Sequence, residues 1–253
     1  MIHNNIRTIL VTGASSGIGK EFCKQLAKPG INLILVARRE ERLLELKRQF
    51  NPSITKMHSV IADLSTIHGI AHVQDVIRQR SPVDLLINNA GSSAYGRFSD
   101  SNLAAQISIA RVQIEATLSL TRTVLPFMRE QNFGRIINVS SIGAFISLKK
   151  TAVYAASKAF LSSFSRSLSE EEADHDIKVQ CLCPGMTRTE IHDPAAFSDF
   201  DKSRVPDKLW TTPDAVVAAS LEALESEKLF VIPGEENIEA ASRGVTELIE
   251  LIQ

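Results

Sequence analysis

Tyr154 and Lys158 stand four residues apart in a segment whose apolar spacing predicts a helix over residues 154–173. Residues at this spacing share one helical face, so the Lys158 ammonium can lie near the Tyr154 phenol. A nearby positive charge favours the phenolate and lowers the pKa of the phenol from its usual value of about 10. The pair therefore predicts a proton donor or acceptor for a carbonyl or alcohol oxygen. The alternative is that the two side chains are unrelated residues of a helix surface.

A glycine-rich turn near the N-terminus could hold phosphates. The sequence from Thr12 to Gly19 reads Thr-Gly-Ala-Ser-Ser-Gly-Ile-Gly, between a predicted strand at 6–12 and a predicted helix at 17–28. Glycines let a backbone turn tightly and approach a pyrophosphate, and a helix N-terminus supplies free N–H groups. We therefore predict a dinucleotide-phosphate site made by Gly13, Ser15, Ser16, Gly17, Ile18 and Gly19. Without this context, such a turn could simply connect two elements.

The end of the second predicted strand indicates which dinucleotide is bound. NAD-binding proteins place a carboxylate there for the ribose 2′-hydroxyl, whereas NADP-binding proteins place arginine near the 2′-phosphate. Here Ala37 is followed by Arg38 and Arg39. A guanidinium suits a phosphate dianion, so the sequence predicts NADP(H). The alternative is that the two arginines only begin the next helix.

Strand-like and helix-like segments alternate along the whole chain, which predicts an α/β fold. The strand-like runs are mostly continuous blocks of Val, Ile and Leu, typical of parallel strands that are covered on both faces. We expect a doubly wound parallel sheet forming a single domain over residues 1–253. The predicted strands are 6–12, 32–37, 56–62, 83–88, 134–140, 178–183 and 229–232. The predicted helices are 17–28, 40–50, 66–79, 100–131 (a short helix and then a long one), 154–173 and 213–226.

Composition excludes several other classes of protein. The 253 residues carry a formal net charge of −1, which argues against a dedicated nucleic-acid binder. Three cysteines are too few for a disulfide framework, and Cys181 and Cys183 have no histidine at ligand spacing, so we predict core packing and no metal site. The sequence shows no secretory signal and no apolar run long enough to span a membrane. We expect a cytoplasmic protein.

Five motifs in this order resemble the short-chain dehydrogenase/reductase family in its single-domain form of roughly 250 residues. They are residues 12–19, Asn88-Asn89-Ala90-Gly91, Ser140-Ser141, Tyr154-Ala155-Ala156-Ser157-Lys158, and Pro184 to Thr189. The resemblance implies hydride transfer between a nicotinamide cofactor and a carbonyl or secondary alcohol. It gives Tyr154 the acid/base role, and it gives Lys158 both the ribose hydroxyls and the shift of the tyrosine pKa.

The same resemblance assigns further site residues. Ser141, thirteen residues before Tyr154, matches the serine that donates to the substrate oxygen, with Ser140 as the competing candidate. Asp63 and Leu64 match the pair that meets the adenine. The cofactor is also expected to contact Asn89, Ala90, Gly91, Pro184, Gly185, Thr187 and Thr189.

One position departs from the family pattern. Many relatives carry a catalytic asparagine in the long helix, where its backbone carbonyl holds a water that relays protons to the lysine. Gln113 stands at this position. Two interpretations remain: an active reductase with a modified relay through Gln113, or a weakened enzyme that serves as an NADP(H)-binding sensor or scaffold. A different enzyme on a dinucleotide-binding fold, such as a methyltransferase, is opposed by Arg38, Arg39 and the Tyr154–Lys158 spacing.

The segment at residues 190–212 lacks periodicity and carries Phe197, Phe200 and Trp210. An insertion of this length in an α/β domain is typical of a lid over a site. We expect its aromatics to face a wall made by Tyr95, Phe98, Phe145 and Ile146, which predicts a bulky apolar carbonyl substrate. The alternative is that these aromatics only pin the segment to the core.

The helix that begins near Tyr154 is also expected to mediate assembly. It carries small residues that would permit close approach of another helix: Ala155, Ala159, Ser162 and Ser163. Together with the long helix around residues 111–129 it resembles the pair that forms dimers in the family. We expect a homodimer or homotetramer with closed symmetry.

Overall fold

A seven-stranded parallel sheet forms the centre of the molecule, in the order β3-β2-β1-β4-β5-β6-β9. The computed structural model describes residues 4–51, 55–80, 82–192, 200, 201, 203 and 205–253. The strands are β1 (Thr8–Thr12), β2 (Asn32–Ala37), β3 (Lys56–Ile61), β4 (Leu85–Asn88), β5 (Gly134–Val139), β6 (Ile177–Leu182) and β9 (Phe230–Val231). The doubly wound α/β fold predicted from the sequence is confirmed.

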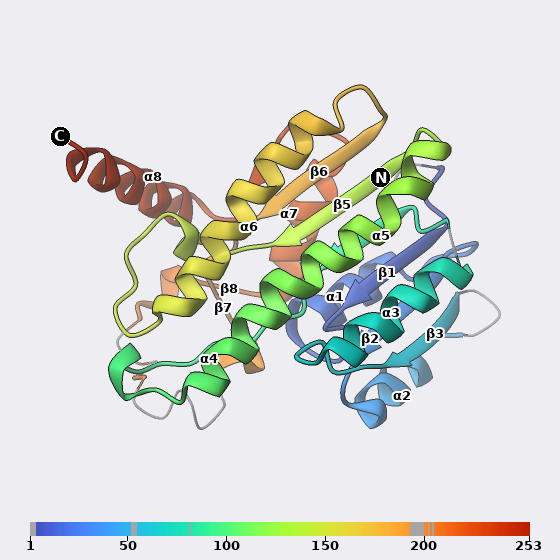
Figure 1. Cartoon of the computed structure of the whole chain (residues 1–253), viewed down its shortest axis with the longest axis horizontal. Helices are drawn as coiled ribbons and strands as arrows, with labels where there is room; N and C mark the ends of the chain where they lie inside the picture. Colours follow the sequence, from blue (N-terminus) through green and yellow to red (C-terminus); the bar gives the residue numbers. More distant parts are fainter. Residues whose placement is uncertain (1–3, 52–54, 81, 193–199, 202, 204) are drawn as a thin grey trace.

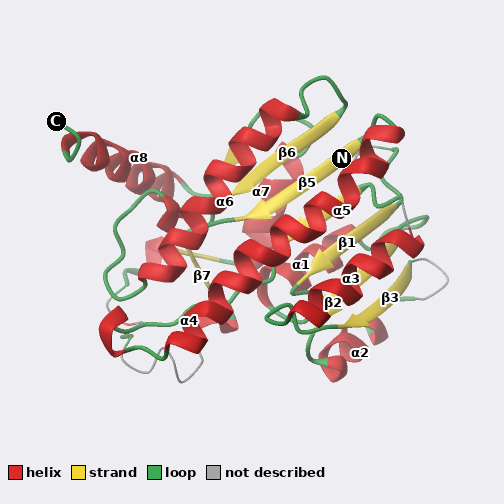
Figure 2. Cartoon of the chain, viewed as in Figure 1, coloured by secondary structure: helices red, strands yellow, loops and turns green. Residues whose placement is uncertain are grey.

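Helices cover both faces of this sheet (Figures 1 and 2). The helices are α1 (Gly17–Leu26), α2 (Glu40–Arg48), α3 (Ile67–Arg80), α4 (Leu103–Ala110), α5 (Ala116–Glu130), α6 (Ala152–Glu171), α7 (Pro213–Ala223) and α8 (Glu235–Glu250). Two apolar cores result. One packs α1, α2 and α7 against the sheet, and the other packs α3, α5 and α6 against the opposite face. The continuous apolar runs of the sequence are explained because β1, β2, β4, β5 and β6 each contribute buried residues to both cores.

The strand order predicts a binding region at the carboxyl ends of the central strands β1 and β4. The chain runs outward from β1 to β3 in one direction and from β4 to β6 in the other, so the order reverses between β1 and β4. In open α/β sheets, ligands bind beyond the carboxyl ends of the strands at such a reversal. The glycine-rich turn follows β1, and Asn89 follows β4.

Two helical regions differ from the sequence prediction. The predicted short and long helices over 100–131 form one continuous helical stretch, in which α4 passes into α5 through a π-helical segment, Arg111–Glu115. Helix α8 was not predicted, and in Figure 1 it projects from the body of the molecule. None of the described helices is long and apolar enough to cross a membrane.

The face expected to mediate assembly is also corrected in part. Ala159 and Ser163 of α6 are exposed, as an interface requires. Ser162 is buried, and its hydroxyl lies 3.2 Å from the Ser140 hydroxyl. Ser162 therefore faces the sheet rather than the outer face of α6. The predicted dimer or tetramer stays a prediction.

Candidate active site

A cavity of about 760 Å³ opens beyond the carboxyl ends of the strands. It brings together nearly all of the residues that the sequence singled out, although they come from seven separate parts of the chain. Those that line it are Gly13, Ser15, Ser16, Gly17, Ile18, Arg38, Arg39, Asp63, Leu64, Asn89, Ala90, Gly91, Ser141, Tyr154, Lys158, Pro184, Gly185, Thr187 and Thr189. Gly19 and Gln113 do not line it.

The glycine-rich turn is held in place by the segment after β4. Thr12 Oγ1 accepts hydrogen bonds from the backbone N–H groups of Asn89 (2.9 Å) and Ala90 (3.0 Å), and Asn89 Nδ2 donates to Thr12 O (2.8 Å). A Cβ atom on Gly13 would lie 2.7 Å from Asn89 Nδ2, and the Gly13 φ of +69° also favours glycine. Asn89 is thus mainly a structural partner of the turn.

Gly19 has a packing role rather than a contact with the cavity. A Cβ atom there would collide with Gly13 O and Asn89 Nδ2. The third glycine therefore lets α1 pack closely against the turn, which is one of the roles glycine has in such fingerprints. Its predicted place among direct cofactor contacts is not supported by the lining of the cavity.

The N-terminus of α1 is available for an anion. Its N-cap residue, Ser16, makes no side-chain capping hydrogen bond, and no acidic residue occupies the first turn. The first N–H groups of a helix need acceptors, and the helix dipole favours a negative charge there. The turn and this helix end therefore fit the pyrophosphate of a dinucleotide.

Arg38, Arg39 and Asp63 lie at the end of the cavity near β2 and β3. Arg39 Nη2 donates to Ser16 Oγ (2.9 Å) and Ser15 Oγ (3.3 Å) of the glycine-rich turn. Burial acts to raise the pKa of Asp63, but hydrogen bonds from the Ser65 N–H and hydroxyl, together with the charge of Arg38, hold that pKa below its usual value. Asp63 is therefore an ionised acceptor near the Arg38 guanidinium.

Ser141, Tyr154 and Lys158 meet where β5 and α6 approach each other. Lys158 is buried, its Nζ donates to Val139 O (2.8 Å), and it lies 5.5 Å from the centroid of the Tyr154 ring. Ser141 Oγ accepts the backbone N–H of Gly143 (3.0 Å). Because that oxygen is already an acceptor, the Ser141 proton is left to donate to Tyr154 or to a substrate oxygen.

The protonation equilibria of this group differ from the sequence expectation. Burial raises the pKa of Tyr154 above 10, and a hydrogen bond with Ser141 only partly opposes this. Burial lowers the pKa of Lys158 to about 8, although Cys181 and Cys183 act to raise it. The predicted lowering of the tyrosine pKa by Lys158 is therefore wrong for this structure, because loss of hydration dominates at both groups.

Ser140 and Gln113 support the site from outside its reacting groups. The Ser140 hydroxyl donates to Lys158 O (2.7 Å), so it fixes α6 against β5. Gln113 lies in the π-helical segment with 1% of its surface exposed, and its Nε2 donates to Ser92 O (2.9 Å). Gln113 Oε1 has no hydrogen-bond partner among the described residues. Its side chain lies behind Gly91 rather than in the cavity, and π-helical turns are frequent at functional sites.

The apolar side of the cavity matches the predicted wall only in part. Tyr95, Ile146 and Phe200 line it, and the rings of Tyr95 and Phe200 meet edge to face with centroids 5.4 Å apart. Phe145 instead packs edge to face on Phe230 at 5.7 Å, and Phe98 is 57% exposed on a short 3₁₀ turn. The prediction that Phe145 and Phe98 form part of this wall was wrong.

Trp210, in the same 190–212 segment, does not line this cavity. Trp210 begins β8 (Trp210–Thr211), which pairs with β7 (Met186–Thr187), and its indole N–H donates to Val205 O (3.3 Å). Its ring lies under Arg188, so Trp210 packs on the outer side of the segment. Phe197 lies outside the described residues.

Comparison with known proteins now identifies the family. Residues 7–197 match the family profile described as short chain dehydrogenase. The chain belongs to the short-chain dehydrogenase family. Among its relatives, an NADP-dependent 3-hydroxy acid dehydrogenase of Schizosaccharomyces pombe is 34% identical over 191 residues, which cover 73% of each chain.

Solved structures of similar dehydrogenases share the whole architecture. One from Sphingobium yanoikuyae, in complex with NADPH, superposes with a TM-score of 0.83 at 29% identity and covers 95% of each chain. A bulky-bulky ketone specific alcohol dehydrogenase from Comamonas testosteroni gives a TM-score of 0.81 at 26% identity, covering 99% of this chain and 96% of that one. The chain is therefore an oxidoreductase with the family's fold.

In this short-chain dehydrogenase, helix α8, which was not predicted from the sequence, also contributes to the cavity. Asn237 and Ala240 of α8 line the cavity, and a Cβ atom on Gly185 would collide with the buried Asn237 side chain. Helix α8 lies beyond the segment that matches the family. Its sequence signals were Gly234, two glutamates that suit a helix N-terminus, and apolar residues at Ile238, Ala241, Val245, Leu248 and Ile252.

Other reactive residues of the short-chain dehydrogenase are structural. All three cysteines are free and buried, and Cys181 and Cys183 pack in the core as predicted. Within the described part of the chain, no cluster of three or more His, Cys, Asp or Glu residues could hold a metal ion.

Proposed function

We propose that the protein catalyses NADP(H)-dependent hydride transfer between the nicotinamide and a carbonyl group or secondary alcohol of an apolar substrate. The observation that supports this most strongly is that one cavity joins the glycine-rich turn, Arg38, and the group formed by Ser141, Tyr154 and Lys158. A nucleotide site and an acid/base group thus open into the same space.

The cofactor would be held along the carboxyl ends of the strands. The uncapped N-terminus of α1 suits the pyrophosphate, Arg38 and Arg39 suit a 2′-phosphate, and Asp63 with Leu64 would meet the adenine. The residues present fit a bound dinucleotide, because the glycines of the turn leave no side chain where the backbone must approach the phosphates. When bound, the nicotinamide supplies or accepts the hydride.

The protein's own residues would manage the proton and the charge on the substrate oxygen. Tyr154 would donate its proton to that oxygen during reduction and recover it during oxidation. Ser141 would stabilise the developing negative charge with its free proton. Lys158, with its pKa lowered to about 8, would gain or lose a proton near that pH and would bind ribose hydroxyls.

An apolar substrate is favoured by the wall opposite the acid/base group. Its side chains are mostly aliphatic or aromatic: Tyr95, Ile146, Leu148, Ile191, Phe200, Val205 and Leu209. Pockets of this kind orient a ligand with few polar contacts, and they bind a ligand more tightly when it buries more apolar surface. The Comamonas relative, whose name describes a preference for bulky ketones, is consistent with this proposal.

Exchanging Arg38 for a carboxylate tests the cofactor proposal. The dissociation constants of NADPH and NADH would be measured by nucleotide fluorescence for the unmodified protein and for Arg38→Asp. We expect the unmodified protein to prefer NADPH and the variant to lose at least about tenfold of that preference, because a charge-assisted contact becomes a repulsion. Arg78→Asp, in an exposed ion pair on α3, is the control and should change neither constant. Equal constants for both cofactors in the unmodified protein would contradict the proposal.

A further inference from the structure

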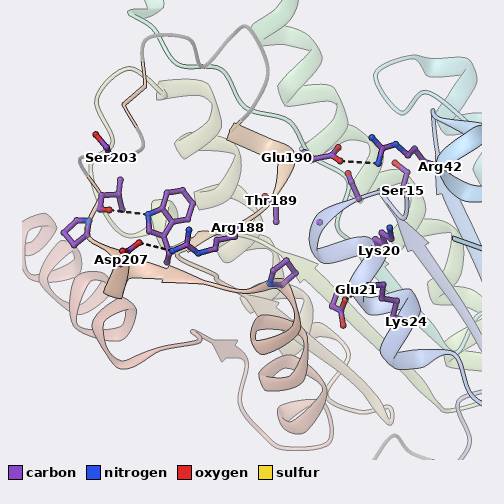
Figure 3. A pocket seen from close by; sticks show the side chains of 16 residues that line it. Ser15, Lys20, Glu21, Lys24, Arg42, Arg188, Thr189, Glu190, Ser203 and Asp207 are labelled. Carbon is purple, nitrogen blue, oxygen red and sulfur yellow. Dashed lines mark hydrogen bonds and ion pairs between the residues drawn. The ribbon is translucent and has the colours of Figure 1, made fainter. Parts of the chain in front are cut away.

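Glu190 lies between two cavities. It lines the candidate active site and also a polar cavity of about 930 Å³ on the outer side of α1 (Figure 3). Lys20 and Lys24 of α1 and Arg42 of α2 line this outer cavity. In Figure 3, Glu190 and Arg42 point toward one another beside Ser15. The carboxylate therefore stands at the boundary between the outer surface and the end of the cofactor site.

The contacts of Glu190 join it to the arginine expected to bind phosphate. Its Oε2 accepts from Arg39 Nη1 at 2.9 Å, and its Oε1 lies 3.6 Å from Arg42 Nη1. The other nitrogen of the Arg39 fork donates to Ser15 and Ser16. Arg39 is thus engaged by an anion that comes from a segment 151 residues away in sequence. Arg38 makes no ion pair with a carboxylate in the described part of the chain.

We propose that Glu190 is a specificity-determining residue that competes with the 2′-phosphate of NADP(H) for Arg39 and so narrows the preference for NADP(H) over NAD(H). This inference rests on the proposed cofactor site. A phosphate dianion that approaches Arg39 meets a carboxylate already on the guanidinium, so the carboxylate must move or repel it. A ribose 2′-hydroxyl can instead donate a hydrogen bond to the same carboxylate, as in NAD-binding sites.

The expected size of the effect follows from the exposure of the pair. The side chains of Arg39 and Glu190 are 45% and 44% exposed, so water and salt weaken their interaction. We expect one such charge beside a dianion to change the dissociation constant of NADPH by about threefold to tenfold. Arg38 keeps its full attraction for the phosphate, which is why a preference for NADP(H) is still expected in the unmodified protein.

The test is the binding of NADPH and NADH, followed by fluorescence, to the unmodified protein, Glu190→Gln and Glu190→Ala. Both variants should bind NADPH about three- to tenfold more tightly, while the affinity for NADH stays the same or falls. The gain should shrink as salt is raised. Because the expected result is a gain in affinity, a folding defect cannot imitate it. Equal changes for both cofactors, or no change in either variant, would overturn the proposal.

Glu21→Gln is the matched control. Glu21 lines the same outer cavity and pairs with Lys24 at 3.4 Å, but it does not contact Arg39. It should leave both dissociation constants unchanged, and a gain equal to that of Glu190→Gln would overturn the assignment to Glu190. The ratio of the constants in the unmodified protein tests the cofactor proposal separately. A ratio of one that rises in Glu190→Gln would support the role of Glu190 while contradicting the proposed preference.

Discussion

The proposed cofactor side and the proposed substrate side of the cavity are built in different ways. On the cofactor side, backbone groups and short buried side chains fix the geometry, as when Thr12 and Asn89 bind each other's main chain. On the substrate side, the contacts are between side chains of loops, such as the rings of Tyr95 and Phe200. A backbone-defined site tolerates few substitutions, whereas a site lined by loop side chains can change its ligand without a change of fold. The acid/base group lies where the two sides meet.

The largest effect is expected at that junction. Tyr154→Phe removes the hydroxyl but keeps the ring, so kcat should fall by about 10²- to 10⁴-fold, the usual contribution of positioned acid/base catalysis. Binding of NADPH should stay nearly unchanged because the cofactor side is intact. Steady-state kinetics and nucleotide fluorescence on the same preparation check both expectations. A variant that turned over at the unmodified rate would mean that another group donates the proton.

The next largest effect is expected from Lys158→Met, on how the free energy of unfolding depends on pH. Its pKa is about 8 when folded and 10.5 ordinarily, so between these values the unfolded chain binds more protons. Stability contributed by this site therefore rises as pH increases from about 8 to 10.5, and its cost of about 3 kcal/mol is complete below pH 8. The stability of Lys158→Met relative to the unmodified protein should fall by about that amount over this window. Urea unfolding at several pH values measures it, and a difference independent of pH would contradict the assigned burial cost.

The sequence predicted which residues of the strand ends line the cavity better than it predicted the apolar wall. Order and spacing sufficed to bring Gly13, Asn89, Ser141 and Tyr154 to one cavity, because each follows a strand end or shares a helix face. The π-helical turn at Gln113 was not predictable, since one extra residue in a turn leaves the apolar pattern almost unchanged.

Contacts between segments that are distant in sequence could not be predicted either. The pairing of Arg39 with Glu190 depends on how two chain segments meet in space. Similarly, whether Phe145 or its neighbour Ile146 faces the cavity depends on the 3₁₀ turn that follows Ser141, and Phe145 turned toward Phe230 instead. Local patterns carry no information on such orientations.

Glycine substitutions sharpen the claim that the backbone defines the cofactor side. Gly19→Ala should lower the free energy of unfolding by about 1–3 kcal/mol, because the added methyl group collides with Gly13 O. Gly96→Ala is the control in a loop on the substrate side, where a Cβ atom would meet nothing within 4 Å, so its effect should stay within about 0.5 kcal/mol. Chemical unfolding compares them, and equal losses would contradict the contrast between the two sides.

The smallest effect is expected from the aromatics of the 190–212 segment. Phe200→Ala should raise KM for an apolar ketone by about fivefold, since it removes apolar surface from the cavity, with little change in Tm. Trp210→Ala should lower Tm by a few degrees and leave KM unchanged, because Trp210 packs on Arg188 outside the cavity. Kinetics and thermal melts of both variants test this split. Equal changes of KM in the two variants would contradict the placement of Phe200 inside the cavity and of Trp210 outside it.

The nucleotide side and the acid/base group are proposed to act together as an NADP(H)-dependent reductase. The most direct test follows nicotinamide absorbance while the unmodified protein is offered NADPH or NADH and a panel of ketones and aldehydes, from small polar to bulky apolar. We predict oxidation of NADPH with a bulky apolar carbonyl compound, and slower turnover with NADH. Tight binding of NADPH without turnover of any compound in the panel would contradict the claim and favour a non-catalytic cofactor-binding role.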